Sequence, residues 1–124
     1  MLKESRMVGF VATSQSEVSK QFYETQLGLD LIEETDFALV FAANSVTVRI
    51  QKVERVFAPP YTTLGWEVEN IESIVRTLVD AGVPFEHYEG MGQDNLGVWS
   101  SPGGAKVAWL KDPDGNLLSL TEPA

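Results

Sequence analysis

Short apolar runs alternate with two amphipathic segments along the chain, and the order of the two kinds of segment repeats. Runs without a helical period predict β-strands in the first half at 7–12, 29–33, 37–42 and 45–51. Comparable runs predict strands in the second half at 63–68, 84–89, 98–100, 105–111 and 117–121. The pattern therefore reads as strand, helix and several strands, twice in succession.

The first amphipathic segment begins with the spacing of a capping box. Ser14 and Glu17 stand three residues apart, which lets each side chain bond the other's free backbone amide and start a helix at this point. Gly28 is placed to end that helix in the left-handed conformation that glycine adopts at little cost. The apolar face of the helix would be formed by Val18, Phe22, Tyr23 and Leu27.

The second amphipathic segment also has residues that can begin and end a helix. Asn70 can cap a helix, Gly82 can end it, and Pro84 prevents its return. Between them runs an apolar stripe with the i, i+3, i+4, i+7, i+8 spacing of a half-buried helix, formed by Ile71, Ile74, Val75, Leu78 and Val79.

The two halves align as an internal repeat. Leu27-Gly28 and Ala81-Gly82 correspond at an offset of 54 residues, and the stiff stretch at 58–60 marks the seam between the halves. We predict one α+β domain over 1–124, made of duplicated βαβββ units at about 5–52 and 61–122. The units would form a curved mixed sheet around a cavity, with the helices on the outside. The alternative is an unrelated α+β sandwich whose two helices merely look alike.

Charge and composition exclude several classes of function. The chain has nine Lys and Arg and 18 Asp and Glu, so its formal net charge is −9. This negative charge argues against nucleic acid as a partner. The chain has no cysteine and a single histidine, His87, so thiolate sites and sites with two imidazoles from one chain are excluded. No apolar run reaches the roughly 20 residues of a membrane span. We therefore expect a soluble, cytoplasmic protein that binds no membrane.

Three motifs in this frame resemble the vicinal oxygen chelate superfamily, which contains glyoxalase I, extradiol dioxygenases, and fosfomycin-resistance and bleomycin-binding proteins. They are Phe22-Tyr23-x-x-x-Leu27-Gly28-Leu29, Leu78-x-x-Ala81-Gly82-Val83 and Asp112-Pro113-Asp114-Gly115-Asn116-Leu117. The resemblance covers nearly the whole chain and implies the curved-sheet fold. It says little about activity, because one fold carries many functions.

The metal enzymes of that superfamily hold a divalent ion with His, Gln and Glu side chains on up to four inward-facing strand positions. Carried over to this chain, those positions fall at or beside Val8, Thr47, Thr63 and Ser119. None is an imidazole or a carboxylate, and Thr and Ser hydroxyls are weak ligands for a catalytic divalent ion. The resemblance thus implies a cavity without its metal, as in the bleomycin-binding branch.

Two charged residues are candidates for binding within the cavity. Strand alternation places Glu67 on the same face as Thr63, where it could pair with a cationic ligand or act as a base. The same alternation places Arg49 with Thr47, where its guanidinium could hold a carboxylate or phosphate. Both have a plainer interpretation, in which Glu67 is solvated or paired with Arg49 and Arg49 forms a salt bridge at the rim.

Aromatic residues offer a second kind of contact. Trp109 stands where the fosfomycin-resistance branch has an aromatic pocket residue, and with Phe10 and Trp99 it could form a stacking wall for a planar ligand. Ordinary core or dimer packing is the alternative, most of all for Trp99. We expect His87 to be exposed or hydrogen-bonded, and the glycine-rich loop at 89–97 to be either a lid or a plain hairpin.

These observations favour a metal-independent protein that binds a small cationic or aromatic molecule, such as an antibiotic, and forms a homodimer. The alternative keeps a divalent metal, recruited through Glu67, His87 or a partner chain, for lyase or dioxygenase chemistry. A third possibility is a non-catalytic interaction module. The sequence does not identify the ligand.

Overall fold

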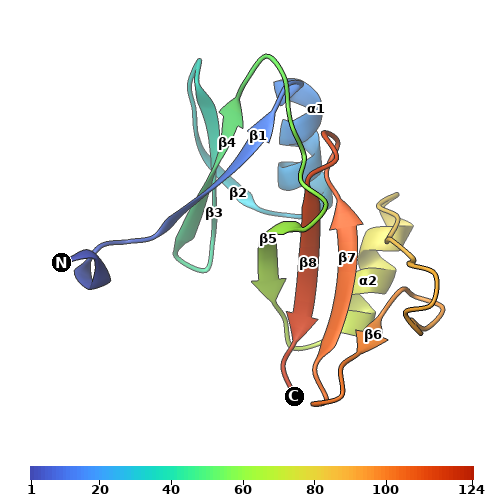
Figure 1. The fold of residues 1–124 in the computed structure, drawn as a ribbon. Helices are drawn as coiled ribbons and strands as arrows, with labels where there is room; N and C mark the ends of the chain where they lie inside the picture. The colour runs from blue at the N-terminus through green and yellow to red at the C-terminus, as the bar shows by residue number, and fades with distance from the viewer.

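The computed structural model describes residues 1–124 and shows two halves, each with one four-stranded sheet and one helical segment (Figure 1). A 3-10 turn precedes the first half at Leu2–Glu4. The first half consists of β1 (Val8–Thr13), α1 (Ser16–Lys20), the π-helical turn η2 (Gln21–Gln26), β2 (Asp30–Glu34), β3 (Ala38–Ala43) and β4 (Val46–Lys52). The second half consists of β5 (Thr62–Glu67), α2 (Ile71–Asp80), β6 (Trp99–Ser100), β7 (Lys106–Lys111) and β8 (Leu117–Glu122).

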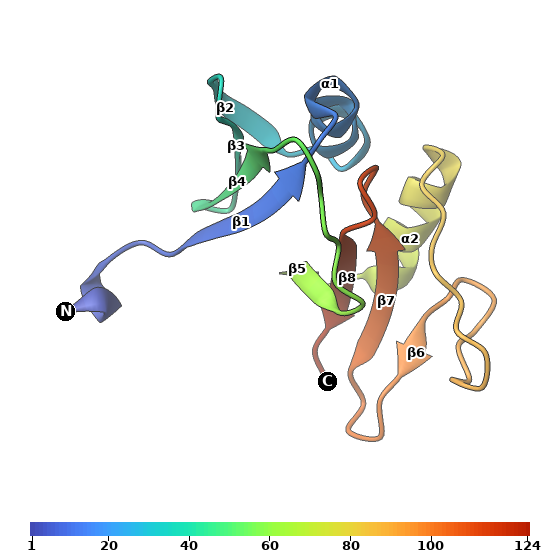
Figure 2. The ribbon, with the colours of Figure 1, turned by 45° about the horizontal axis from the view of Figure 1, so that its top comes forward.

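Both sheets have the same strand order. The first is ordered β1-β4-β3-β2 and the second β5-β8-β7-β6, with one parallel pair in each, β1 with β4 and β5 with β8. The two sheets adjoin at β1 and β5, and each bears its helix on the outside (Figure 2). The predicted α+β class and the duplicated βαβββ arrangement are confirmed, with the curved surface built from two sheets.

Each sheet buries one face beneath its helix. In β4, Val48 and Ile50 are buried, whereas Thr47 and Arg49 alternate with them on the other face. Tyr23 of η2 packs on Phe41 of β3 with ring centroids 5.8 Å apart, so the helical segment covers the Val48 and Ile50 face. In the second half α2 packs on β7 and β8. The opposite faces of both sheets carry no helix.

The capping box predicted at Ser14 and Glu17 is wrong. The helix begins at Ser16 with Gln15 as N-cap, and no side chain of the segment caps it. The carboxylate of Asp114 in the second half accepts hydrogen bonds from the Ser14 amide at 3.0 Å and from the Ser14 hydroxyl at 3.1 Å. A tertiary acceptor has thus replaced the local one. Val18, placed on the apolar face, is 51% exposed.

The cap of α2 is also tertiary. Asn70 occupies the N-cap position without a side-chain hydrogen bond, and the Ile71 amide donates to Glu122 Oε1 at 3.0 Å. Ile71, Val75 and Leu78 are buried as the stripe predicts, whereas Val79 is 48% exposed. Gly28 and Gly82, which follow the two helical segments, both adopt the predicted left-handed conformation, with φ of 76° and 88°.

The strand predicted at 84–89 is wrong. Only Phe85 forms a bridge there, to Leu110, and the Glu86 amide donates to the Trp109 carbonyl at 2.8 Å. Beyond Glu86 the chain leaves β7 and returns at β6. The side chain of Gln93 replaces the hydrogen bonds that a neighbouring strand would provide. Its oxygen accepts from the Tyr88 amide, and its nitrogen donates to the Glu86 and Gly97 carbonyls.

The turn at 112–116 joins the two halves. Asp112 accepts a 2.6 Å hydrogen bond from the Tyr23 hydroxyl, and Asn116 Nδ2 donates to the Ala12 carbonyl at 2.8 Å. Thr13 Oγ1 donates to Asp114 at 2.5 Å. These contacts fix η2 and the end of β1 against the hairpin between β7 and β8. No helix in the structure is long and apolar enough to span a bilayer.

Candidate functional site

The helix-free faces of the two sheets carry all the residues that the sequence analysis placed in the cavity. In the first sheet Thr47 lies opposite Val8 and Arg49 lies opposite Phe10, so these four side chains share one face. In the second sheet Ser119 lies between Gly65 and Trp109 in the strand register. Trp99 pairs with Val107 on the same face as Trp109. On β5, Glu67 alternates with Trp66, and Thr63 lies at a register shift between Thr62 and Leu64, where it has no strand partner.

An aromatic cluster occupies this face of the second sheet. The rings of Trp99 and Trp109 lie 6.3 Å apart at 38°, and the ring of Tyr88 meets Trp109 edge-on at 5.8 Å. Phe10 is absent from the cluster because it lies on the other sheet, 60% exposed and with no aromatic partner. Sequence reasoning missed Tyr88, since its place beside Trp109 depends on the excursion of the chain between Glu86 and β6.

A hollow of about 400 Å³ lies next to the cluster, at the segment that connects the two halves. The Lys111 ammonium is 3.5 Å from the Glu86 carboxylate, so its charge is balanced within the chain. The lining residues are Ala58, Pro59, Pro60, Tyr88, Lys111, Gly115 and Leu117. The proline stretch that the sequence marked as a seam is therefore one wall of this hollow.

A second hollow, of about 300 Å³, contains Thr47 and Glu67 and lies between the two halves. Arg49 takes no part in it and forms no ion pair, so neither the Arg49 to Glu67 pairing nor another salt bridge of Arg49 is present. The Thr63 hydroxyl is engaged, because it donates to the Leu117 carbonyl at 3.1 Å. The structure thus distributes the predicted residues over two regions instead of one.

The single histidine and the glycine-rich loop lie beside the aromatic cluster. His87 is exposed, and a side chain at Gly97 would meet its ring at 3.3 Å. No carboxylate or hydroxyl bonds His87, so it has no partner for proton transfer. The Asp94 carboxylate accepts from the Leu96 and Val98 amides, both at 2.9 Å, which braces the loop internally.

The four positions that the superfamily uses for metal ligands do not provide a suitable donor set. Val8 has no donor atom, and the remaining three residues offer only hydroxyl oxygens, of which that of Thr63 bonds the backbone. A catalytic divalent ion requires about three imidazole, carboxylate or comparable ligands. The residues at these positions therefore do not fit the ion, and no chemical step can be derived through it.

Comparison with known proteins identifies the family. A sequence model of the Glyoxalase/Bleomycin resistance protein/Dioxygenase superfamily matches residues 7–120, and the chain therefore belongs to this superfamily. A search of curated protein sequences found no match.

Solved structures with the same fold are distant in sequence. A glyoxalase family protein from Bacillus anthracis aligns with a TM-score of 0.76 at 15% identity, covering 97% of this chain and 95% of that one. A glyoxalase family protein from Enterococcus faecalis aligns at 0.71 and 22%, covering 94% of each chain. Lactoylglutathione lyase from Agrobacterium tumefaciens aligns at 0.74 and 12%, covering 95% and 92%. At these identities the likeness establishes the fold alone.

Proposed function

We propose that this chain binds a small planar aromatic or cationic molecule at the cluster of Tyr88, Trp99 and Trp109, without a metal ion and without transforming it. The observation that carries the proposal is this aromatic cluster on a helix-free sheet face, beside a hollow of about 400 Å³. Stacked and edge-on rings recognise flat ligands, and their negative faces attract cations.

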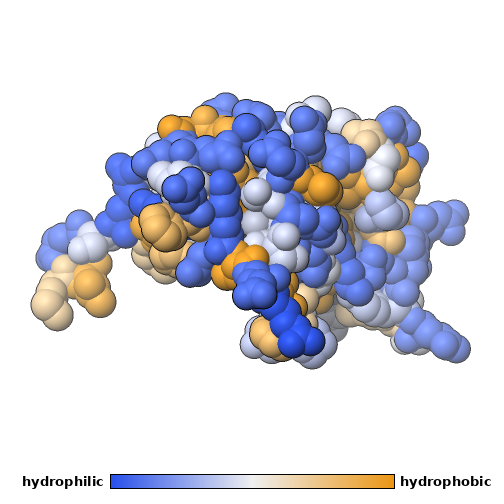
Figure 3. Space-filling model, turned by 90° about the horizontal axis from the view of Figure 1, so that it is seen from above, coloured by the Kyte–Doolittle hydropathy of each residue, from blue (hydrophilic) through white to orange (hydrophobic).

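The charge of the chain supports the cationic part of the proposal. A formal net charge of −9 creates a field that draws cations toward the surface. Hydrophilic residues make up much of the face seen in Figure 3, with hydrophobic areas between them. The one lysine in the hollow is balanced by Glu86, so it does not oppose a cationic ligand.

The proposal that binding needs no metal ion is based on the residues at the positions where superfamily enzymes have metal ligands. Superfamily membership by itself allows lyase or dioxygenase chemistry, but Val8, Thr47, Thr63 and Ser119 supply no imidazole or carboxylate. Binding, rather than turnover, is the activity that these side chains support.

Titration with the planar cationic dye thioflavin T tests the proposal. Dye fluorescence should rise with saturable binding, and Trp109→Leu should raise the Kd about tenfold, because an apolar residue of reduced size cannot stack. The matched control Trp66→Leu changes the tryptophan on the opposite face of the second sheet and should leave the Kd within twofold. Circular dichroism confirms that both variants are folded.

The same titration addresses the metal. In chelator-treated protein the Kd should be the same as in the presence of Mn²⁺, Ni²⁺ or Zn²⁺, and none of these ions should raise the melting temperature. A bound ion at 100 times its Kd would add about 2.7 kcal/mol to stability, which a thermal melt detects. Binding that requires a metal, or equal loss in the Trp109 and Trp66 variants, would contradict the proposal.

We also propose that two copies of this chain form a homodimer through the helix-free face of the first sheet. Val8 and Phe10 present apolar side chains, 40% and 60% exposed, on the helix-free face of the edge strand β1. Light scattering after gel filtration should give twice the 13.7 kDa chain mass. Phe10→Asp should give the mass of a single chain. The control Phe57→Asp, at an 81% exposed residue of the connecting segment, should keep the dimer mass.

A further inference from the structure

A cavity of about 290 Å³ lies between the two halves on the side of the sheets that bears the helices. It is separate from the aromatic cluster, because Trp66 alternates along β5 with Gly65 and Glu67 and so points away from the face of Trp99 and Trp109. Eight of its nine lining residues are hydrophobic: Leu27, Leu29, Trp66, Val68, Ile74, Leu78, Leu110 and Leu120. The ninth is Glu67.

Rigid elements keep this cavity open. One wall is Leu27 and Leu29, which flank the left-handed Gly28 after η2, and the other belongs to α2 and the second sheet. The hydrogen bond from Tyr23 to Asp112 holds η2 against the second half at 2.6 Å. The first half therefore cannot move freely toward α2 to fill the space.

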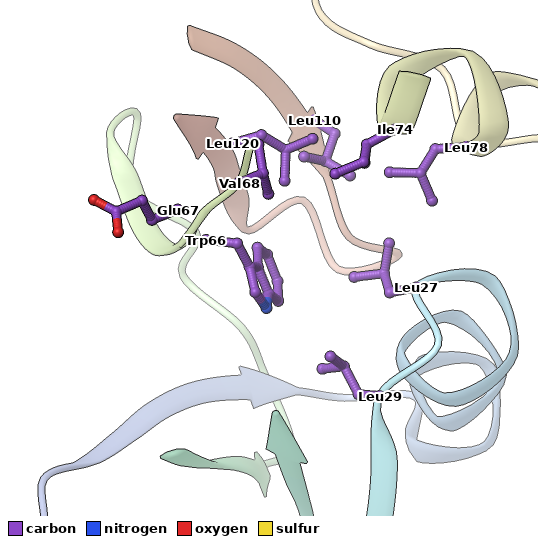
Figure 4. A pocket seen from close by; sticks show the side chains of 9 residues that line it. All are labelled: Leu27, Leu29, Trp66, Glu67, Val68, Ile74, Leu78, Leu110 and Leu120. Carbon is purple, nitrogen blue, oxygen red and sulfur yellow. The ribbon is translucent and has the colours of Figure 1, made fainter. Parts of the chain in front are cut away.

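Trp66 supplies the cavity's one polar donor that has no partner. Its indole lies among the apolar side chains, with the nitrogen at the end nearer Leu29 (Figure 4). The nitrogen donates no hydrogen bond within the chain and is accessible to solvent, so a molecule that enters beside the indole can reach it. An N–H in apolar surroundings gains most from an acceptor that enters with an apolar body.

The lack of a charged group among the inward-facing side chains restricts the ligand further. The carboxylate of Glu67 points away from the other side chains that line it (Figure 4). A charged ligand would lose its hydration here without meeting an opposite charge, which costs several kcal/mol. The electrostatics therefore favour a neutral molecule.

We propose that this cavity binds a neutral, mainly apolar small molecule, whose carbonyl or ether oxygen accepts a hydrogen bond from Trp66 Nε1. The volume suits a compact bicyclic ketone. The proposal is independent of the aromatic cluster, since it uses another face of the second sheet and a ligand that is neither planar nor charged.

Camphor and camphene form a matched pair of probes, because they share a bicyclic framework and only camphor has a carbonyl oxygen. The three indole N–H signals are resolved in a ¹H–¹⁵N correlation spectrum and assigned with single Trp→Phe variants. Camphor should move the Trp66 signal downfield in a saturable way and leave those of Trp99 and Trp109 in place. Camphene should bind on the order of fivefold more weakly, the value of one hydrogen bond, and give no downfield shift.

Two variants of α2 locate the binding. Ile74→Phe fills the cavity from one wall and should abolish the camphor response, whereas Val79→Phe, at a 48% exposed position of the same helix, should keep it. Thermal melts verify that both variants fold. An unmoved Trp66 signal at millimolar camphor, similar shifts of all three indoles, or an intact response in Ile74→Phe would each overturn the proposal.

Discussion

The phenolic hydroxyl of Tyr23 donates a 2.6 Å hydrogen bond to the carboxylate of Asp112, and the two residues stand 89 positions apart in the chain. Both are buried, Tyr23 completely and Asp112 to 5% exposure. The other oxygen of Asp112 accepts from the Asp114 and Asn116 amides at 3.0 and 2.9 Å, which shapes the hairpin turn. One carboxylate thus forms its own turn and binds the helical segment of the other half.

Removal of the Tyr23 hydroxyl should destabilise the fold. Tyr23→Phe keeps the ring and deprives a buried carboxylate of one donor, so the free energy of unfolding should fall by about 1.5–3 kcal/mol. Urea denaturation measures the loss. The control is Tyr61→Phe, at a residue that is 66% exposed and donates no hydrogen bond, and it should stay within about 0.5 kcal/mol of the parent.

The same residue should make stability depend on alkaline pH. Burial, and then the charge of Asp112, raise the pKa of the Tyr23 phenol above its ordinary value of 10. The folded state then keeps a proton that the unfolded state releases, so this contribution is complete below about pH 10 and declines above it by up to about 1.4 kcal/mol per pH unit. Tyr23→Phe should remove that part of the slope.

Ultraviolet absorbance at 295 nm provides an independent measurement of this titration. The difference in absorbance between the parent and Tyr23→Phe isolates the Tyr23 phenol, and this difference should show phenolate only once the protein unfolds. Phenolate absorbance from Tyr23 at moderate alkaline pH without loss of structure would show that its hydroxyl is not held by Asp112 as described.

The start of α1 should depend on Asp114 and not on Glu17. Asp114→Ala removes the acceptor of the Ser14 amide and hydroxyl and of the Thr13 hydroxyl, and the loss of these hydrogen bonds should cost about 1–3 kcal/mol. Glu17→Gln should change little, because Glu17 caps nothing in the structure. Chemical denaturation of the two variants compares the tertiary cap with the local capping box, and a larger loss in Glu17→Gln would favour the latter.

Gly65 should tolerate no side chain while Ser119 is present. A methyl group at Gly65 would lie 2.9 Å from Ser119 Oγ and 3.3 Å from the Ser119 carbonyl oxygen. Gly65→Ala should therefore cost about 1–3 kcal/mol in the free energy of unfolding. Adding Ser119→Ala should recover part of the loss, because it removes the nearer atom.

A second glycine serves as the control for this overlap. A methyl group at Gly103 would have its nearest contact at 4.0 Å, so Gly103→Ala should be close to neutral. If the double variant at Gly65 and Ser119 is no more stable than Gly65→Ala, the clash does not involve the Ser119 hydroxyl.

Local patterns predicted most elements to within one residue because they depend on neighbours in the chain. The strand at 37–42 is β3, at Ala38–Ala43, and the stripe from Ile71 is α2. The turn after β3 is one residue later than expected, with Asn44 and Ser45 both at positive φ. The strand at 84–89 failed because Pro84 and the side-chain bonds of Gln93 replace regular pairing there.

Strand alternation also predicted which residues share a face, since the side-chain period of two is a local property. Thr47 and Arg49 lie on one face of β4, as predicted. It could not predict that Phe10 and Trp99 stand on separate sheets, or that Tyr88 contacts Trp109, because both facts depend on how the halves and the 87–98 excursion are placed.

The sequence by itself determined the repeated order of elements and the ends of the helices at Gly28 and Gly82, because these are properties of residue type and spacing. Only the tertiary structure decided that Asp114 binds Ser14 ahead of α1, that Glu122 caps α2, that Tyr23 bonds Asp112, and that Trp66 faces a cavity between the halves. A hydrogen bond or cavity wall formed by residues distant in the chain leaves no periodic signal, since its geometry exists only after the two sheets have packed.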